Sequence, residues 1–509
     1  MPVSVMDKSQ ATLYGVLAAL VAIYVFRWRT NRLQHIPTLG GPSDPVLSYL
    51  SAFNYILNST KILREGYERF KGSAFKVADL ESWTVILNGP EMVDEIRKRP
   101  DEELSAMESN EEFLQIRYIF GKEPYEDPYH IHLTRDKLTR TLPAIVPDLV
   151  DELRATLPEY VPTHGDEWTT IDVTTTTQKI VARLSNRVFV RLPVCRNEEY
   201  LKMAVSIATD LIKDAFILKT SPHFLRPIVA WLASSTRRTV RRALPYLRPV
   251  IAERKEQIAE HGLGQDWPGK PNDMLQWIIE NEMLRGAEDE AIIARILLVN
   301  FQAIHTTSTS ITHALYHLAA SPEYIHPLRE EVQSIIAAEG WTKTALGKMR
   351  KLDSFLKESQ RYNGISLVAP GRKALKDVRL SDGTVIPAGT MVNMNTHRLH
   401  LDDACYPNAN EFDPFRFARI REVDGEGTKH QFTHTSNQYV AFGIGRHACP
   451  GRFFAATELK ALLAYIVINY DLKVAGDGTR PRNLYFSHAI LPSMSGKIML
   501  RKCQVEEVT

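Results

Sequence analysis

The stretch that decides the fold reads FGIGRHACPGRFFAATELK and spans residues 442–460. It places one cysteine, Cys449, between glycines and beside basic side chains. Apolar residues then recur at intervals of three and four from Phe454 to Val467, which predicts a helix through the late 460s. Pro450 suits the first helical position, so Cys449 is expected at the positive end of the helix dipole. This setting lowers a thiol pKa and favours the thiolate.

Three uses of Cys449 compete: a buried structural thiol, half of a disulfide, or a thiolate that holds a metal. The other cysteines, Cys195, Cys405 and Cys503, show no framework spacing, which argues against a disulfide. A zinc site would need four ligands, usually two closely spaced pairs of Cys or His residues. Cys449 and His447 form one such pair at most, and no second pair stands near them in the sequence. A single thiolate as the only protein ligand fits haem iron better, and the structural thiol stays the alternative.

The segment F-G-I-G-R-H-A-C-P-G at 442–451 resembles the haem-binding loop of the cytochrome P450 family, F-x-x-G-x-[RH]-x-C-x-G. The residues in register are Phe442, Gly445, His447, Cys449 and Gly451. The resemblance implies that these residues bind haem b and that Cys449 is the axial ligand of its iron. It also implies a mainly α fold with a small β part, the cytochrome P450 fold, built as a single large domain after an N-terminal anchor helix.

Glu358 and Arg361 lie in a predicted helix, three residues apart and therefore neighbours on its surface. Taken alone, this spacing is more often a solvent-exposed pair. In the resembled family, an E-x-x-R helix and a later arginine form a buried charge triad. The resemblance therefore assigns Glu358, Arg361 and Arg416 to a triad with a structural role.

The two propionates of haem should attract cationic or hydrogen-bond-donating side chains. The resemblance assigns these contacts to His447, Arg135 and Arg372. Without the resemblance, Arg135 is equally well explained as part of a solvent-exposed helix face. The tryptophan that the family commonly has four residues earlier is Ile131 here.

A long helix is predicted over residues 291–319, and it contains the segment QAIHTTS at 302–308. Hydroxyl groups that bond back to helix carbonyls explain this segment in the simplest way. The family motif at this place is A/G-G-x-D/E-T-T/S. It implies that Thr306 is a catalytic residue in proton delivery. His305 stands where the family usually has an acid, and it is expected to be the second catalytic residue, which feeds protons to Thr306.

The chain has 509 residues, a net charge of +2 and an ordinary composition, with 44% hydrophobic and 24% charged residues. Its overall charge gives no case for nucleic-acid binding. Two short strands are predicted over 75–87 and a hairpin over 378–386. No linker after residue 45 separates two cores, so residues 46–509 are interpreted as one large haem-thiolate monooxygenase domain.

Residues 11–26 read ATLYGVLAALVAIYVF and carry no charge, and Arg27, Trp28 and Arg29 follow them. As a helix, this stretch rises about 24 Å, slightly short of a bilayer core of about 30 Å. Arginines that snorkel would still allow a span. We therefore predict a membrane anchor at 1–28, with a cleavable signal peptide as the alternative. The positive flank predicts a single-pass protein of the endoplasmic reticulum whose catalytic domain is cytosolic.

Residues 29–45 are rich in proline and glycine and are expected to form a hinge after the anchor. The family resemblance implies a monooxygenase that inserts one oxygen atom of O2 into an organic substrate. No flavin or nicotinamide fingerprint is evident, so electrons should come from a separate NADPH-cytochrome P450 reductase.

The segments GRHACPGR and HTTS look most like fungal members of the family, including terpenoid-modifying enzymes. A small hydrophobic substrate, terpenoid or sterol-like and belonging to secondary metabolism, is therefore expected. Two alternatives stay open. One is a haem-thiolate isomerase or dehydratase that acts without reductase, and the other is a non-enzymatic haem carrier or sensor.

Overall fold

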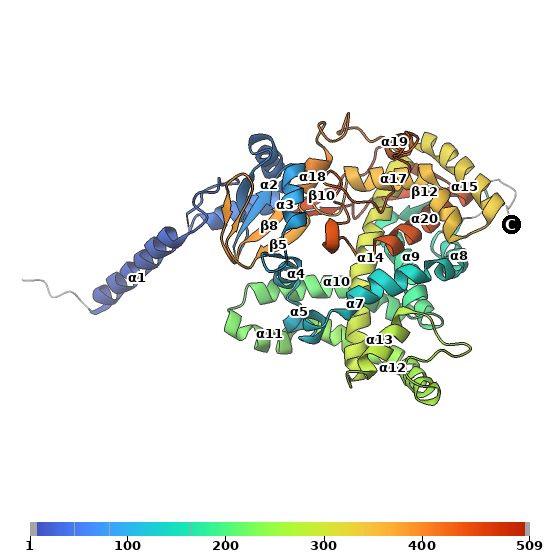
Figure 1. Cartoon of the computed structure of the whole chain (residues 1–509), viewed down its shortest axis with the longest axis horizontal. Coiled ribbons are helices and arrows are strands. Elements are labelled where there is room, and N and C mark those ends of the chain that lie inside the picture. Colours follow the sequence, from blue (N-terminus) through green and yellow to red (C-terminus); the bar gives the residue numbers. More distant parts are fainter. Residues whose placement is uncertain (1–7, 45, 81, 164, 504–509) are drawn as a thin grey trace, which may run out of the picture. The chain divides into compact units, whose positions relative to one another are not determined.

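The computed structural model describes residues 8–44, 46–80, 82–163 and 165–503 (Figure 1). The described chain packs as two compact units. Unit 1 draws its residues from 1–109, 368–399 and 485–488, and unit 2 from 110–367, 400–484 and 489–509. Helices dominate and the strands are short, so the predicted mainly α class with a small β part is confirmed.

Unit 1 contains a five-stranded sheet in the order β1-β2-β8-β5-β3. Strand β2 pairs with β1 antiparallel and with β8 parallel, and β5 pairs antiparallel with both β8 and β3. The predicted strand pair over 75–87 and the predicted hairpin over 378–386 are confirmed. The elements of this part of the chain are α1 (Lys8–Thr30), α2 (Ser48–Arg69), β1 (Ala74–Ala78), β2 (Trp83–Leu87), α3 (Pro90–Lys98), β3 (Leu104–Ser105), α4 (Ala106–Leu114, which crosses the unit boundary), β5 (Gly371–Ala374), β6 (Val378–Arg379), β7 (Val385–Ile386), β8 (Met391–Met394) and α18 (Thr396–His400, whose last residue belongs to unit 2).

Helix α1 contains the apolar stretch 11–26 that predicts the anchor. It also includes Lys8, Arg27 and Arg29, so its uncharged part is shorter than the whole helix. Within the described residues, no helix has both the length and the apolar character that crossing a membrane requires. The prediction of a transmembrane span is therefore not supported.

Unit 2 holds the predicted helices over 291–319 and through the late 460s, as α14 and α20. Pro450 is not in the first turn of α20, because that helix begins two residues later, at Arg452. The elements are α5 (Ile116–Ile119), α6 (Glu123–Glu126), α7 (Tyr129–His132), the π-helical turn Leu133–Leu138, α8 (Thr139–Tyr160), β4 (Thr169–Asp172), α9 (Val173–Phe189), α10 (Glu198–Lys219), α11 (Arg226–Ala233), α12 (Ser235–His261), α13 (Met274–Met283), α14 (Asp289–Ala320), α15 (Ile325–Glu339), α16 (Lys343–Lys348), α17 (Arg350–Tyr362), α19 (Arg416–Ile420), α20 (Arg452–Asn469), β9 (Tyr470–Val474), β10 (Leu484–Phe486, which crosses the unit boundary), β11 (Ala489–Leu491) and β12 (Lys497–Lys502).

Side-chain caps fix where several of these helices begin. Asp172 accepts a hydrogen bond from the Thr175 amide at 2.8 Å at the start of α9. Asp273 does the same for α13, where it accepts from the Gln276 amide at 2.8 Å. Each cap satisfies an amide that has no partner inside its helix, so these boundaries follow directly from the sequence.

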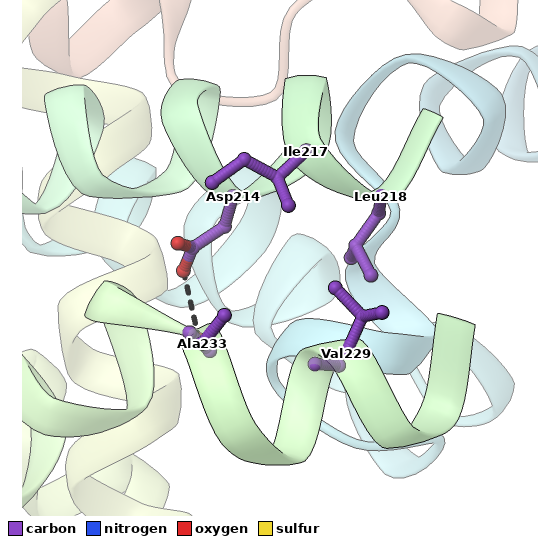
Figure 2. A pocket seen from close by; sticks show the side chains of 7 residues that line it. Asp214, Ile217, Leu218, Val229 and Ala233 are labelled. Atoms are coloured by element: carbon purple, nitrogen blue, oxygen red, sulfur yellow. Dashed lines mark hydrogen bonds between the residues drawn. The ribbon is translucent and has the colours of Figure 1, made fainter. Parts of the chain in front are cut away.

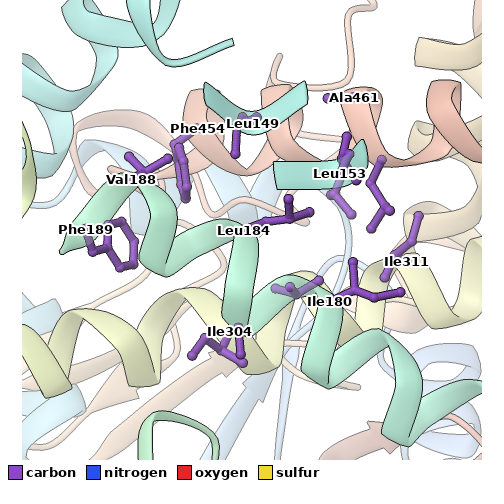
Figure 3. Close-up of a cluster of buried hydrophobic side chains, with 14 of the residues drawn as sticks. Leu149, Leu153, Ile180, Leu184, Val188, Phe189, Ile304, Ile311, Phe454 and Ala461 are labelled. Atoms are coloured by element: carbon purple, nitrogen blue, oxygen red, sulfur yellow. The ribbon is translucent and has the colours of Figure 1, made fainter. Parts of the chain in front are cut away.

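The core of unit 2 holds α14 and α20 in place through α9, which runs between them (Figure 3). Ile180 of α9 lies on the side of Ile304 and Ile311 of α14 in this cluster, and Leu184 points toward Leu153 of α8. At the other side of α9, Phe189 packs against Phe454 of α20 with ring centroids 5.5 Å apart. The helix that carries Thr306 and the helix that follows Cys449 are thus fixed by one apolar core.

A buried carboxylate ties α10 to the start of α12. Asp214 reaches from α10 toward the end of α11 (Figure 2). It accepts hydrogen bonds from the hydroxyls of Ser234 and Ser235, both at 2.7 Å, and from the amides of Ser235 and Thr236 at 2.9 and 2.8 Å. Burial, the largest influence, raises the pKa of Asp214, but these donors outweigh it and the pKa lies below its ordinary value. The carboxylate therefore stays ionised and keeps the α11–α12 junction closed.

Candidate functional site

The loop that carries Cys449 is closed by its own backbone. The Cys449 amide donates to the Phe442 carbonyl at 2.7 Å, and the Gly443 amide donates to Val440 at 2.8 Å. Gly443 has φ +72°, and a Cβ there would lie 3.1 Å from the His447 carbonyl. Glycine is therefore required at this turn both by conformation and by space.

The two other glycines of the motif and Phe442 shape the same loop. Gly445 has φ +64° and begins the short turn that ends at His447. A Cβ at Gly451 would lie 3.5 Å from Thr134, which is an ordinary contact, so space within the protein does not by itself require glycine there. Phe442 is buried and meets Phe432 edge to face at 5.2 Å. The motif residues thus hold the loop against the core.

The thiol of Cys449 lies next to groups that favour its ionised form, yet burial dominates. Burial raises the pKa of Cys449 above its ordinary value. The Gly451 amide, the Arg452 charge and the Arg452 amide each lower that pKa, but their sum is smaller than the effect of burial. The predicted lowering of the pKa is therefore wrong for the protein alone, because desolvation of the thiolate outweighs its donors.

This donor set fits a haem iron. A metal cation deprotonates a thiol that coordinates it, and the two amides and Arg452 can then stabilise the sulphur charge. The cysteine packs against the apolar core together with Phe453, so its surroundings are largely apolar. Among the described residues, no group of three or more His, Cys, Asp or Glu side chains is placed to hold a metal ion. Iron ligation by one thiolate is the arrangement that these residues allow.

Arg135 and His447 both lie beside the Cys449 loop. Arg135, on the π-helical turn Leu133–Leu138, donates from Nη2 to the Arg446 carbonyl at 3.3 Å. Arg446 donates from Nε to His447 Nε2 at 3.2 Å. The structure therefore brings two of the three predicted propionate-binding side chains to one loop.

Arg372 belongs to unit 1, where it lies on β5 opposite Val392 of β8. Its side chain is buried, and Nη1 donates to the Gly371 carbonyl at 2.7 Å. Asn393 and Ser109 crowd Gly371, since a Cβ there would come within 2.9 Å and 2.7 Å of their side chains. The strand thus fixes Arg372 in a narrow setting.

Thr306 is exposed although it lies in the middle of the long, mostly buried helix α14. Its hydroxyl donates to the Gln302 carbonyl at 2.9 Å, the ordinary bond of a helical threonine. Gln302, one turn earlier, is exposed as well. This part of α14 therefore presents a polar, accessible surface within a buried element.

The His305 side chain, unlike that of Thr306, bonds to another helix, α10. Its Nε2 lies 2.8 Å from the Val205 carbonyl of α10, so this nitrogen carries the proton and donates it. Burial lowers the pKa of His305, and the bond to Val205 opposes that effect. The ring is therefore neutral at pH 7 and held against α10.

Glu358, Arg361 and Arg416 meet in the interior of unit 2. Arg361 binds the Glu358 carboxylate with two parallel bonds of 2.7 Å each, from Nε and Nη2. Arg416 donates from Nε to the same carboxylate at 3.2 Å. Glu358 and Arg361 have no exposed surface, so the three charges are buried together.

Lys357, the residue before Glu358, has a role that the sequence did not predict. It is buried, and its ammonium donates to the carbonyls of Gln431 and His434 at 2.9 and 3.3 Å. Burial, the largest influence, lowers the pKa of Lys357 to about 7. No local sequence pattern marks Lys357 as buried, because polar residues (Asp353, Ser354, Gln360 and Arg361) stand three and four positions away on α17.

Comparisons with known proteins agree with this site. The family model described as Cytochrome P450 matches residues 41–500. The chain belongs to the cytochrome P450 family. It is 46% identical to cytochrome P450 monooxygenase 103 of Postia placenta over 97% of this chain and 98% of that protein. It is 33% identical to ent-kaurene oxidase P450-4 of Gibberella fujikuroi over 96% of this chain and 97% of that protein.

The fold is similar to that of a solved P450, the cyanobacterial CYP120A1 bound to retinoic acid. That structure has a TM-score of 0.68 and 18% identity, and the match covers 92% of this chain and 99% of the other. The predicted family, the P450 fold and the monooxygenase class are thus confirmed. Haem bound through a cysteine is general to this P450 family.

We predict that Glu358→Gln lowers the free energy of unfolding by about 3–5 kcal/mol, because two buried guanidinium groups lose their charged partner. Urea unfolding followed by circular dichroism measures the change. Glu426→Gln is the matched control, since Glu426 pairs with Lys429 and His430 near the surface. Equal effects of the two substitutions would contradict a stabilising triad.

We predict that Cys449→Ser abolishes the thiolate-type absorption spectrum of the reduced, carbon monoxide-bound protein, because serine cannot supply the thiolate. Cys405→Ser removes a cysteine outside this loop and should leave the spectrum intact. A thiolate-type spectrum that survives in Cys449→Ser would show that the ligand lies elsewhere.

Proposed function

We propose that this P450 monooxygenase oxidises a hydrophobic, terpenoid or sterol-like substrate with electrons from NADPH-cytochrome P450 reductase, and that Cys449 is the axial ligand of its haem b. The observation that carries the proposal is the Cys449 loop, in which two amides and Arg452 lie beside a partly buried thiol. The common core of α9, α14 and α20 supports a single site formed by this loop and the accessible part of α14.

Each haem-binding residue has a distinct role in this proposal. Cys449 holds the iron, and His447, Arg135 and Arg372 supply donors to the propionates. The glycines at 445 and 451 and the ring of Phe442 keep the loop close and apolar. When bound, the haem supplies the activation of O2, and the protein supplies ligation, orientation and protons.

Proton delivery is assigned to Thr306. Its hydroxyl already donates to the Gln302 carbonyl, so its lone pairs remain able to accept a hydrogen bond from a water molecule. His305 is proposed as a weaker contributor. Because its Nε2 proton is engaged by Val205, it could supply protons only at lower pH, where Nδ1 becomes protonated.

The name of one relative supports the substrate class. Ent-kaurene oxidase P450-4 is by its name an oxidase of ent-kaurene, and it matches nearly the whole chain at 33% identity. We infer from this relationship that a small apolar molecule of terpenoid type, made in secondary metabolism, is the substrate here as well.

The reductase is expected to dock on the basic side chains that flank Cys449. Arg446 is exposed and Arg452 is partly exposed, and both lie next to the cysteine in sequence. Positive charge at this surface suits an acidic electron-transfer partner, because opposite potentials speed the encounter. Arg452 also donates to the Cys449 carbonyl at 2.9 Å, so the surface is linked to the ligand loop.

Attachment to the endoplasmic reticulum membrane is proposed through α1. Val16, Val21, Ile23 and Phe26 of this helix are exposed apolar side chains, and Trp28 is exposed beyond them. Such a surface is stabilised when it contacts lipid, and aromatic side chains favour the interface. The catalytic part is then expected on the cytosolic side.

We predict that Thr306→Ala keeps haem and substrate binding but lowers the product formed per NADPH by about 10²-fold or more, with hydrogen peroxide released instead. The assay uses the enzyme with reductase and follows product, NADPH and peroxide from pH 5 to 8. Thr306→Ser retains the hydroxyl and should retain most of the coupling. His305→Ala should cause a smaller loss, largest at low pH.

Unchanged coupling in Thr306→Ala would refute the relay and leave Thr306 as an ordinary helical threonine. Turnover of substrate without NADPH and reductase would instead favour an isomerase or dehydratase. Haem binding with no turnover of any apolar substrate in either condition would favour a haem carrier or sensor.

We predict that deletion of residues 1–28 releases most of the protein from membranes and leaves haem incorporation intact, because α1 carries a large group of exposed apolar side chains. Flotation with lipid vesicles compares the deleted and complete chains. A substitution of Tyr14 by Phe, which keeps α1 apolar, is the control. A deleted chain that still floats quantitatively would show that another surface holds the membrane.

A further inference from the structure

A second polar cluster of unit 2 lies on the C-terminal half of α14, beyond Thr306. Arg480 donates from Nη2 to His313 Nδ1 and to Asn363 Oδ1, both at 3.1 Å. Asn483 donates to the same Asn363 oxygen at 3.0 Å. The Asn363 amide nitrogen in turn lies 2.7 Å from His317 Nε2. These side chains form a connected network whose α14 members are buried.

The contacts of His313 assign its protonation. A guanidinium can only donate, so Nδ1 of His313 is an acceptor and Nε2 carries the proton. Burial and then the charge of Arg480 lower the pKa of His313 to about 3, so the ring is neutral. The Nε2 atom has no hydrogen-bond partner in the part of the chain that the structure describes, although the residue is only 2% exposed.

A second buried polar atom without a hydrogen-bond partner among the described residues is the hydroxyl oxygen of Ser359. Ser359 of α17 accepts a bond from the Asn363 amide at 3.2 Å through its carbonyl. Its own hydroxyl is buried and lacks a hydrogen-bond partner among the described residues. Buried polar atoms without protein partners usually bind internal water, which makes two to four hydrogen bonds.

His313 lies on the same stripe of α14 as Thr306. The two are seven residues apart, nearly two full turns, and Ser310 lies between them at a spacing of four and three. The Ser310 hydroxyl donates to the Thr306 carbonyl at 2.9 Å, which leaves its oxygen able to accept. Helical side chains lean toward the N-terminus, so the ring of His313 extends over the turn that carries Ser310.

The opposite stripe of α14 lies in the core and is largely apolar, with the buried Ser308 between Ile304 and Ile311. Ile304 and Ile311 face α9 in the core, roughly half a turn of the helix away from Thr306 and His313 (Figure 3). The packing of Ile304 and Ile311 therefore directs Thr306, Ser310 and His313 to one common side. His305 is excluded from this stripe, because its Nε2 is bound to Val205 of α10.

We propose that His313 binds an ordered internal water through Nε2–H, and that this water, with Ser310, positions the water that serves the Thr306 hydroxyl. His313 is then a positioning residue and not a catalytic residue, and the proposal rests on the proposed function of Thr306. The proton moves through water and hydroxyl groups, while the ring keeps its own proton and its charge is unchanged. Arg480 holds the ring in the required tautomer.

The first test is a crystal structure of the full-length holoenzyme at a resolution that defines water. We expect a water molecule at hydrogen-bond distance from His313 Nε2 in the wild type and in His313→Gln, which retains an N–H donor. His313→Phe should lack that water. An ordered ring with no water at Nε2 in the wild type overturns the proposal, whatever the enzyme's activity.

The second test measures product and peroxide per NADPH with reductase. We expect His313→Phe to lower coupling by about 10-fold or more, His313→Gln to stay within about 2-fold of the wild type, and His313→Phe to add no loss to Thr306→Ala. Unchanged coupling in His313→Phe, or additive losses in the double variant, overturns the proposal. His313→Met replaces His313→Phe if the latter does not fold.

His130→Gln is the matched control. His130 is also buried, its Nδ1 lies 3.2 Å from Arg295 Nη1, and its pKa is likewise lowered to about 3, chiefly by burial. Its substitution should leave coupling unchanged, and a loss equal to that of His313→Phe would overturn the proposal. If the wild type forms no product with reductase, the proposed function fails while the crystallographic test still decides the water site.

Discussion

The bidentate pair between Glu358 and Arg361 is the interaction on which the ligand loop depends. Both residues sit on α17, yet Arg361 also donates from Nη1 to the Ala409 carbonyl at 2.8 Å. The Glu358 carboxylate additionally accepts the Asp413 amide at 3.0 Å. The pair is therefore the point at which a regular helix fixes a long segment with little secondary structure of its own, and that segment leads to Cys449.

Other polar side chains of α17 extend this control along the same segment. Lys357 holds the carbonyls of Gln431 and His434, and Gln360 accepts from the Tyr439 hydroxyl at 3.1 Å. Because the segment lacks a hydrogen-bonded ladder, its backbone groups need partners from elsewhere. Long side chains of α17 supply several of these hydrogen-bond partners. They therefore fix the backbone of the segment that precedes Phe442.

The parts of the molecule that depend on local rules could be predicted from sequence. The apolar spacing after Phe454 predicts α20, and the motif around Cys449 predicts the ligand loop and the family. The start of α20 at Arg452 and the raised pKa of Cys449 could not be predicted in this way. The raised pKa depends on the burial of the thiol, which is a property of the whole fold, and the exact first residue of a helix varies by one or two positions around any sequence signal.

The triad and Lys357 differ in the same way: local spacing and the family pattern predict the triad, whereas the burial of Lys357 depends on the whole fold. A spacing of three places Glu358 beside Arg361 in any helix, and the family pattern adds Arg416. Whether the adjacent Lys357 is buried depends on Phe417 and Tyr439, whose rings lie 4.9 and 4.1 Å from its ammonium nitrogen. Those rings come from distant parts of the sequence, so no local pattern could place them.

Helix α14 shows how one element reconciles an apolar core with polar chemistry. Ile304 and Ile311 occupy one face, and their packing on α9 leaves little freedom for the helix to rotate. Thr306 and Ser310 satisfy their own donors on carbonyls one turn earlier, so the opposite face remains polar without costly unpaired hydroxyl groups. His313 differs from these hydroxyl residues, because its Nδ1 is bonded to Arg480 and not to a carbonyl of its own helix. Its Nδ1 is satisfied by Arg480 from another part of the chain, and its Nε2, which has no partner among the described residues, is the atom at which we propose an internal water.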